Sequence, residues 1–130
     1  MSAPTQWPVP VVLNWPRPPL WPNARVHWAA KARVVAKARD DARWMTRAAG
    51  LGGCATGAHR LCMRITFHPP DRRRRDRDNL VAALKAAMDG VADAIGCDDA
   101  RFVPTYEIGE PAPPHGCVLV SIHQPERGSA

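Results

Sequence analysis

The chain has 130 residues, 45% of them hydrophobic and 23% charged, a composition that is typical of one globular domain and excludes a disordered or fibrous protein. Lysine and arginine number 18 against 12 acidic residues, which gives a net charge of +6 at pH 7. This excess of positive charge favours a polyanionic partner, nucleic acid first, although many basic proteins have only a solvated surface.

The sequence also predicts a cytoplasmic protein with free thiols. No apolar run is long enough to cross a membrane, and the start, MSAPTQWPVPVVLNWP, is interrupted by proline and lacks the basic segment of a signal peptide. The four cysteines form no CxxC pair, which favours a reducing compartment. A zinc site is disfavoured, because its candidate ligands lack the spacing of the usual zinc fingers: Cys54, His59, Cys62 and His68.

The first third of the chain predicts a strand, a stiff loop and a long helix. Residues 9–15 (VPVVLNW) are a short apolar run typical of a strand. Residues 15–23 (WPRPPLWPN) are rich in proline, which fixes the backbone and removes hydrogen-bond donors, so they predict an extended loop. Residues 24–49 contain no glycine or proline and predict a helix with Asn23 as its N-cap.

This predicted helix has two distinct faces. Its apolar face repeats at steps of three or four residues: Val34, Ala38, Ala42, Met45 and Ala49. A basic stripe follows at steps of four: Arg39, Arg43 and Arg47. The stripe is either solvated surface or a contact for a phosphate backbone, and the sequence leaves both readings open.

A second strand and a second helix are predicted in the middle of the chain. Residues 50–59 are a glycine-rich connector without the pattern of a phosphate loop, and residues 60–67 (RLCMRITF) alternate as a strand does. The next helix presents a core face: Leu80, Leu84, Met88, Val91 and Ile95. We expect Asn79 to cap its start and Gly96 to end it.

The last third predicts two strands. Residues 100–109 form one, in which Pro104 favours an edge position or a bulge, and residues 117–124 form the other. The order β-α-β-α-β-β predicts a single α+β domain spanning residues 1–130, with a mixed sheet packed against two helices. Residues 1–8 and 125–130 are expected to be flexible.

The charge run DRRRRDRDN, residues 71–79, lies between the second strand and the second helix. Asp76 and Asp78 are two residues apart, so in an extended backbone their carboxylates point to the same side. A further acid, Asp98 or Asp99, comes after a helix of about 17 residues, roughly 25 Å long. The three acids can therefore meet only if the chain returns alongside that helix.

Carboxylates that meet must be neutralised by cations. Arginines would make a structural ion-pair network, whereas Mg²⁺ would make a site for phosphoryl chemistry, with Arg72 to Arg75 holding phosphates. Lys85 shares a helix face with Asp78 and Asp89, and is either a substrate contact or the surface partner of Asp89. Taken alone, these residues favour a solvated charge run, because such clusters are frequent.

Three segments together resemble the RusA family of Holliday junction resolvases: DRRRRDRDNL, the following helix with KAAMDG, and DDARFV. The opening WPRPPLWPNARVHW also resembles the start of that family. The resemblance covers most of the chain and implies a RusA-like fold and a homodimeric Mg²⁺-dependent endonuclease, with Mn²⁺ as a substitute. Such enzymes are common in phages and prophages, which implies the host cytoplasm. The implied substrate is a four-way DNA junction, cut by paired symmetric nicks.

Carried over by position, the resemblance implies that Asp76, Asp78 and Asp99 are metal-binding catalytic acids. The family's catalytic lysine falls on Ala82 here, and Lys85, one turn further on the same face, is expected to replace it. The expected DNA-binding residues are the two arginine groups: Arg72, Arg73, Arg74, Arg75, Arg39, Arg43 and Arg47. The alternatives are a nuclease for branched or flap DNA with loose structure preference, and a DNA-binding module without catalysis.

The tryptophans are expected mainly in the core or in a dimer interface: Trp7, Trp15, Trp21 and Trp28. Stacking of a loop tryptophan on an unpaired base is the less favoured reading. Trp44 lies between the apolar and the basic faces of its helix.

Overall fold

The computed structural model describes residues 5–17, 20 and 28–128. Four strands form the sheet: β1 (Val9–Asn14), β2 (Leu61–His68), β3 (Phe102–Ile108) and β4 (Cys117–Ile122). The helices are α1 (Trp28–Ala48), α2 (Arg77–Ala83) and α3 (Lys85–Ile95), followed by a short 3₁₀ helix, η2 (Asp99–Arg101). The predicted strands are confirmed, with ends that differ by one or two residues.

The sheet is mixed, with the strand order β1-β4-β2-β3. β4 is antiparallel to both of its neighbours, whereas β2 and β3 are parallel. A parallel pair needs a long crossover, and the segment with α2 and α3 supplies it. The predicted α+β domain with a mixed sheet is therefore confirmed. Pro104 lies on β3, at an edge of this sheet, as expected.

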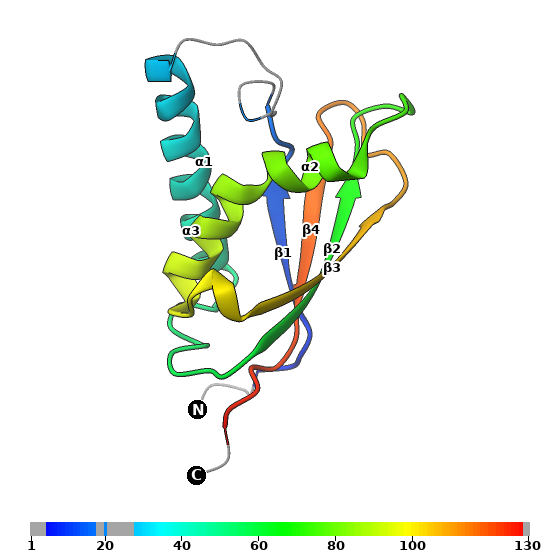
Figure 1. Cartoon of the computed structure of the whole chain (residues 1–130). Helices are drawn as coiled ribbons and strands as arrows, with labels where there is room; N and C mark the ends of the chain where they lie inside the picture. Colours follow the sequence, from blue (N-terminus) through cyan, green and yellow to red (C-terminus); the bar gives the residue numbers. More distant parts are fainter. Residues whose placement is uncertain (1–4, 18–19, 21–27, 129–130) are drawn as a thin grey trace.

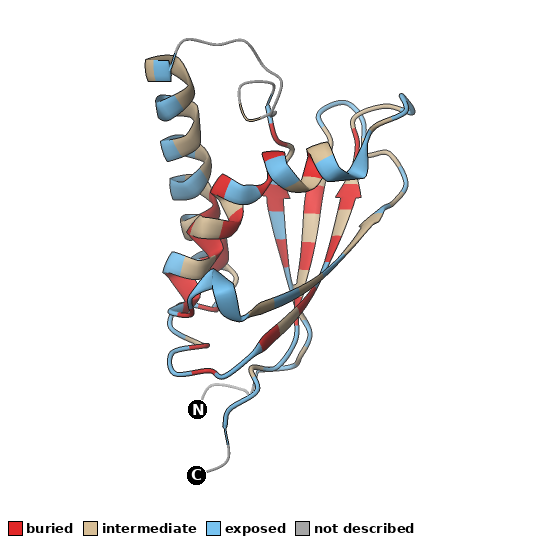
Figure 2. Cartoon of the chain, viewed as in Figure 1, coloured by how far each residue is buried: buried red, intermediate tan, exposed pale blue. Residues whose placement is uncertain are grey.

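The helices pack against one face of the sheet (Figure 1). Side chains of β2 and β4 alternate between buried and less buried positions, and Figure 2 shows this banding along the strands. The predicted core face of the second helix is confirmed, since Leu80, Leu84, Met88, Val91 and Ile95 all belong to the buried core. Burial of each such side chain contributes about 1.5–3 kcal/mol to the free energy of unfolding.

The second helix differs from its prediction in two respects. It begins at Arg77 and is divided at Leu84 into α2 and α3. The division is a bend, because the Leu84 N–H still donates to the Leu80 carbonyl at 3.1 Å. Its N-cap is Asp76, so the prediction of Asn79 is wrong: the Asp76 carboxylate accepts the N–H of Asp78 at 2.9 Å.

Helix α1 lies directly against α3. At the closest point, a β-carbon on Gly90 would overlap the carbonyl oxygen of Arg39, so only glycine permits this approach. The Arg39 guanidinium also donates to both carboxylate oxygens of Asp93, at 2.6 and 2.9 Å. The predicted N-cap Asn23 lies outside the described residues.

The tryptophans do not share one environment. Trp15 meets Phe67 edge-on, with ring centroids 6.3 Å apart, and Trp7 also packs against the core. In contrast, Trp28 and Trp44 on α1 are exposed. Trp21 lies outside the described residues, so its predicted role stays a prediction.

Within the C-terminal tail, Glu126 and Arg127 contact the loop that precedes β2. The backbone of Glu126 pairs with that of Arg60, and the Arg127 guanidinium donates to the carbonyls of Thr56 and Cys54. In the part of the chain that the structure describes, no helix has both the length and the apolar character needed to span a membrane.

Candidate active site

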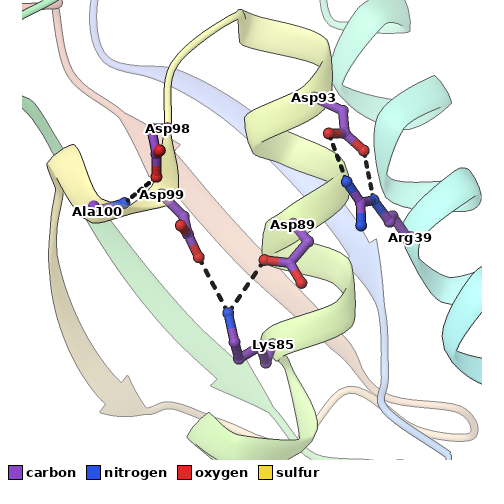
Figure 3. A network of polar contacts seen from close by, with 7 residues as sticks. All are labelled: Arg39, Lys85, Asp89, Asp93, Asp98, Asp99 and Ala100. Atoms are coloured by element: carbon purple, nitrogen blue, oxygen red, sulfur yellow. Dashed lines mark hydrogen bonds and ion pairs between the residues drawn. The ribbon is translucent and has the colours of Figure 1, made fainter.

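Lys85, the first residue of α3, is the centre of an exposed polar cluster (Figure 3). Its ammonium donates to Asp99 at 3.1 Å and to Asp89 at 3.3 Å. The Lys85 side chain remains 69% exposed, so solvent and a large ligand can reach it. Two of the predicted catalytic residues, Lys85 and Asp99, are thus in direct contact, and the predicted Lys85–Asp89 surface pair is also present.

Asp99 reaches Lys85 because the chain reverses after α3. Gly96 ends the helix with φ of 79°, a left-handed conformation that favours glycine. Asp98 then caps η2, its carboxylate accepting the N–H of Ala100 at 2.9 Å. This turn directs Asp99 back along α3, as Figure 3 shows. The expectation that the chain must return alongside the helix is confirmed for this acid.

Hydrogen bonds within the cluster determine the charge states of Lys85 and Asp99 at neutral pH. The hydrogen bond to Asp99, followed by that to Asp89, raises the pKa of Lys85. The same bond, together with one involving Asp98, holds the pKa of Asp99 below its ordinary value. Lys85 is therefore an ammonium group rather than a proton acceptor. An ammonium has three N–H donors, and since Asp89 and Asp99 accept two, one remains for a ligand such as a phosphate oxygen.

Asp76 and Asp78 lie at the other end of the helix pair, where α2 begins. Asp76 has an extended backbone with φ of −80° and ψ of 122°. Asp78, however, is already in the first helical turn, so the expectation of one extended stretch through both acids is wrong. The cause is the cap itself, which starts the helix between them. Both residues are exposed.

The donor chemistry of these acids suits Mg²⁺. This ion prefers oxygen ligands and is typically held by one or two carboxylates, with waters and substrate phosphates completing its shell. Among residues 5–17, 20 and 28–128, no three His, Cys, Asp or Glu side chains form a group that could hold a metal. Asp76, Asp78 and Asp99 are therefore not brought together as one metal-binding group in the part of the chain that the structure describes. Their assignment as Mg²⁺ ligands stays a prediction.

The four consecutive arginines of the charge run have unequal roles. The side chain of Arg75 is only 13% exposed; it lies 2.9 Å from the Asp71 carboxylate and above the Trp15 ring at 5.5 Å. It therefore holds this loop to the core. Arg72 and Arg73 make only long ion pairs, at 3.6 and 3.7 Å. Together with the exposed Arg74, they are the members of the run available to a ligand.

The three arginines of the basic stripe on α1 also differ in their contacts. Arg39 is held by Asp93 on α3, and Arg43 lies 2.6 Å from Asp40 on its own helix. Arg47 forms no ion pair with any residue that the structure describes. The stripe thus changes from a structural contact at Arg39 to an available cation at Arg47.

Sequence reasoning did not assign Asp89 to the candidate site. The signal was present, because Asp89 lies four residues after Lys85, but that spacing is also typical of an ordinary surface pair. Only the return of Asp99 to the same ammonium shows that the pair is part of a larger cluster.

No family model matches the chain. An uncharacterized protein of Xylella fastidiosa (strain Temecula1 / ATCC 700964) is 42% identical to it over 113 residues. The match covers 86% of this chain and 74% of the Xylella protein.

Proposed function

We propose that this chain, which belongs to the same family as the Xylella fastidiosa protein, is a Mg²⁺-dependent endodeoxyribonuclease with a RusA-like fold. It resolves Holliday junctions by paired symmetric nicks, acting in the cytoplasm in DNA recombination, repair or phage DNA processing. The observation that carries the proposal is the contact of Lys85 with Asp99, because it joins the late acid that the resemblance implies to the lysine that we expect to replace the one absent at Ala82. The net charge of +6 also suits a DNA substrate.

The carboxylates of Asp76, Asp78 and Asp99 are the proposed Mg²⁺ ligands. Bound Mg²⁺ supplies an activated water and stabilises the negative charge that develops on the scissile phosphate. Asp76 has one carboxylate oxygen committed to the Asp78 N–H, which fixes its orientation at the start of α2. The second oxygen of Asp76 and both oxygens of Asp78 remain for ligand binding.

Lys85 supplies a preorganised positive charge. Asp89 and Asp99 orient its ammonium from two sides, and the third N–H donates to a non-bridging oxygen of the phosphate. A fixed donor of this kind stabilises a transition state because it need not reorganise during the reaction. Arg72, Arg73 and Arg74 bind neighbouring phosphates and position the strand. Two such sites in a twofold-symmetric dimer suit two symmetric nicks.

The direct test is cleavage of an end-labelled synthetic four-way junction beside a linear duplex of the same sequence, in Mg²⁺ and in EDTA. We expect paired nicks in the junction alone, and only with Mg²⁺. Cleavage of flaps and forks at the same rate as the junction would instead indicate a nuclease for branched DNA with loose structure preference.

A DNA-binding module without catalysis is the second candidate. One observation favours it: Lys85 is ion-paired with both Asp89 and Asp99, as in a structural ion-pair network. Tight junction binding without cleavage in either Mg²⁺ or Mn²⁺ would establish this candidate and overturn the nuclease.

A further inference from the structure

Trp44 is an exposed tryptophan in the C-terminal part of α1. It retains 57% exposure, although both Ala42 and Thr46, two residues to either side, are buried. At about 100° per residue, Trp44 lies nearly opposite Ala42 on the helix, so its ring faces away from the core. Tryptophan is highly buried on average in folded proteins, and this position therefore calls for a reason other than packing.

Two arginines lie beside this ring. The guanidinium of Arg47 is 5.4 Å from the ring centroid and that of Arg43 is 5.5 Å from it, both within the range of a cation–π contact. We call Arg43, Trp44 and Arg47 the Trp44 platform. Arg47 has no carboxylate partner in the described ranges, so its charge is available to an anion.

We propose that the Trp44 platform binds an unpaired stretch of DNA, one base stacking on the indole while Arg43 and Arg47 contact the flanking phosphates. An aromatic surface within a basic patch is the usual arrangement for single-stranded nucleic acid, because every base has a face that can stack. Duplex DNA keeps its bases stacked inside and offers this ring no base face. The inference rests on the proposed function only for the choice of DNA as the polyanion.

The platform is connected to the candidate active site through α3. Arg39, one turn before Arg43, is bonded to Asp93, and Figure 3 shows Asp93, Asp89 and Lys85 in succession along the same helix. Arg43 also contributes to the lowered pKa of Asp93. The helix that carries the platform therefore packs directly against the helix that carries Lys85.

The test is equilibrium binding of a labelled oligothymidine of roughly 15 nucleotides and of a labelled duplex, by fluorescence anisotropy in EDTA. Stacking on one base corresponds to about a tenfold change in Kd. Trp44→Ala should weaken single-strand binding by about that factor and change duplex binding less than twofold. Trp44→Phe should restore most of the affinity. Trp28→Ala is the matched control, since Trp28 is an exposed tryptophan of the same helix, and it should bind as the wild type does.

Three outcomes would overturn the platform: no single-strand binding by the wild type, unchanged affinity in Trp44→Ala, or equal losses for single strand and duplex. Because Trp44 is exposed, an unchanged melting temperature of each variant verifies its fold. The assay needs no cleavage, so the two proposals fail separately. A wild type that cuts no junction but binds oligothymidine through Trp44 contradicts the nuclease alone. A wild type that cuts junctions with Trp44→Ala unaffected in binding contradicts the platform alone.

Discussion

The two ends of the α2–α3 helix pair carry the same residue type in opposite situations. Before α2, the carboxylate of Asp76 is engaged by the backbone, because it accepts the N–H that starts the helix. After α3, the carboxylate of Asp99 is engaged by a cation, the ammonium of Lys85. The effect of losing each acid therefore depends on the group that its carboxylate contacts. Loss of Asp76 affects helix formation and the proposed metal site together, whereas loss of Asp99 affects the proposed metal site and the contact with Lys85.

The largest effect is expected when Asp78 or Asp99, the acids that do not cap α2, is neutralised. Asp78→Asn and Asp99→Asn should each lower junction cleavage at least about 100-fold, because each removes a proposed metal ligand. Junction affinity in EDTA should change less than threefold, since the basic surface is intact. Single-turnover rates and gel-shift titrations measure the two effects. Parallel loss of binding and of folding would mean that these acids hold the fold instead.

Lys85 is the cation that distinguishes the Asp99 end of the helix pair from the Asp76 end. Lys85→Ala should slow cleavage by roughly 10- to 100-fold at unchanged junction affinity, because one preorganised donor to the phosphate is lost. The matched control is Lys37→Ala: Lys37 forms an equivalent exposed pair with Asp41, at 2.7 Å and four residues apart, but outside the candidate site. If both variants cut at the wild-type rate, Lys85 is an ordinary surface lysine.

The cap at the first end predicts a stability effect that the second end lacks. Asp76→Ala should lower the free energy of unfolding by about 1 kcal/mol, the usual cost of losing an N-cap. Asp76→Asn should retain most of this stability, because asparagine caps as well as aspartate does. Urea unfolding of the two variants measures the difference. Equal destabilisation would show that the charge, and not the cap, is what matters at Asp76.

The smallest expected effect concerns the pH dependence of stability, through Asp93. The hydrogen bond from Arg39 lowers the pKa of Asp93, with a smaller contribution from Arg43. A lowered folded-state pKa gives stability that is complete above the ordinary pKa of aspartate, near 3.9, and is lost as the pH falls through the folded value. Asp93→Asn should therefore reduce stability more at pH 7 than at pH 2. Unfolding midpoints at both pH values test this, and equal losses would contradict it.

Much of the fold follows from the sequence because its signals are local and periodic. The core face from Leu80 to Ile95 repeats with the helical period, and the strands alternate with a period of two. The bend at Leu84 carries no such signal, because no glycine or proline marks it. The sequence also does not distinguish Asp76 from Asn79 as the N-cap, since both residue types are good N-caps.

The candidate site was less predictable than the fold, for a physical reason. Four consecutive arginines look identical in sequence, and only the tertiary contact with Trp15 sets Arg75 apart. Similarly, the exposure of Trp44 depends on how α1 sits on the core, although its position between two helix faces was visible in the spacing. The contact between Lys85 and Asp99 requires the reversal at Gly96, which joins residues on either side of a turn.

Because Gly90 has no side chain, the backbones of α1 and α3 fix the distance between the two helices. Backbone meets backbone there, so the spacing of the two helices is independent of side-chain rotamers, which can adjust. Under the proposed function, the interval between the Trp44 platform and the Lys85 cluster is then a built-in length. A DNA branch that engages both must therefore span that length.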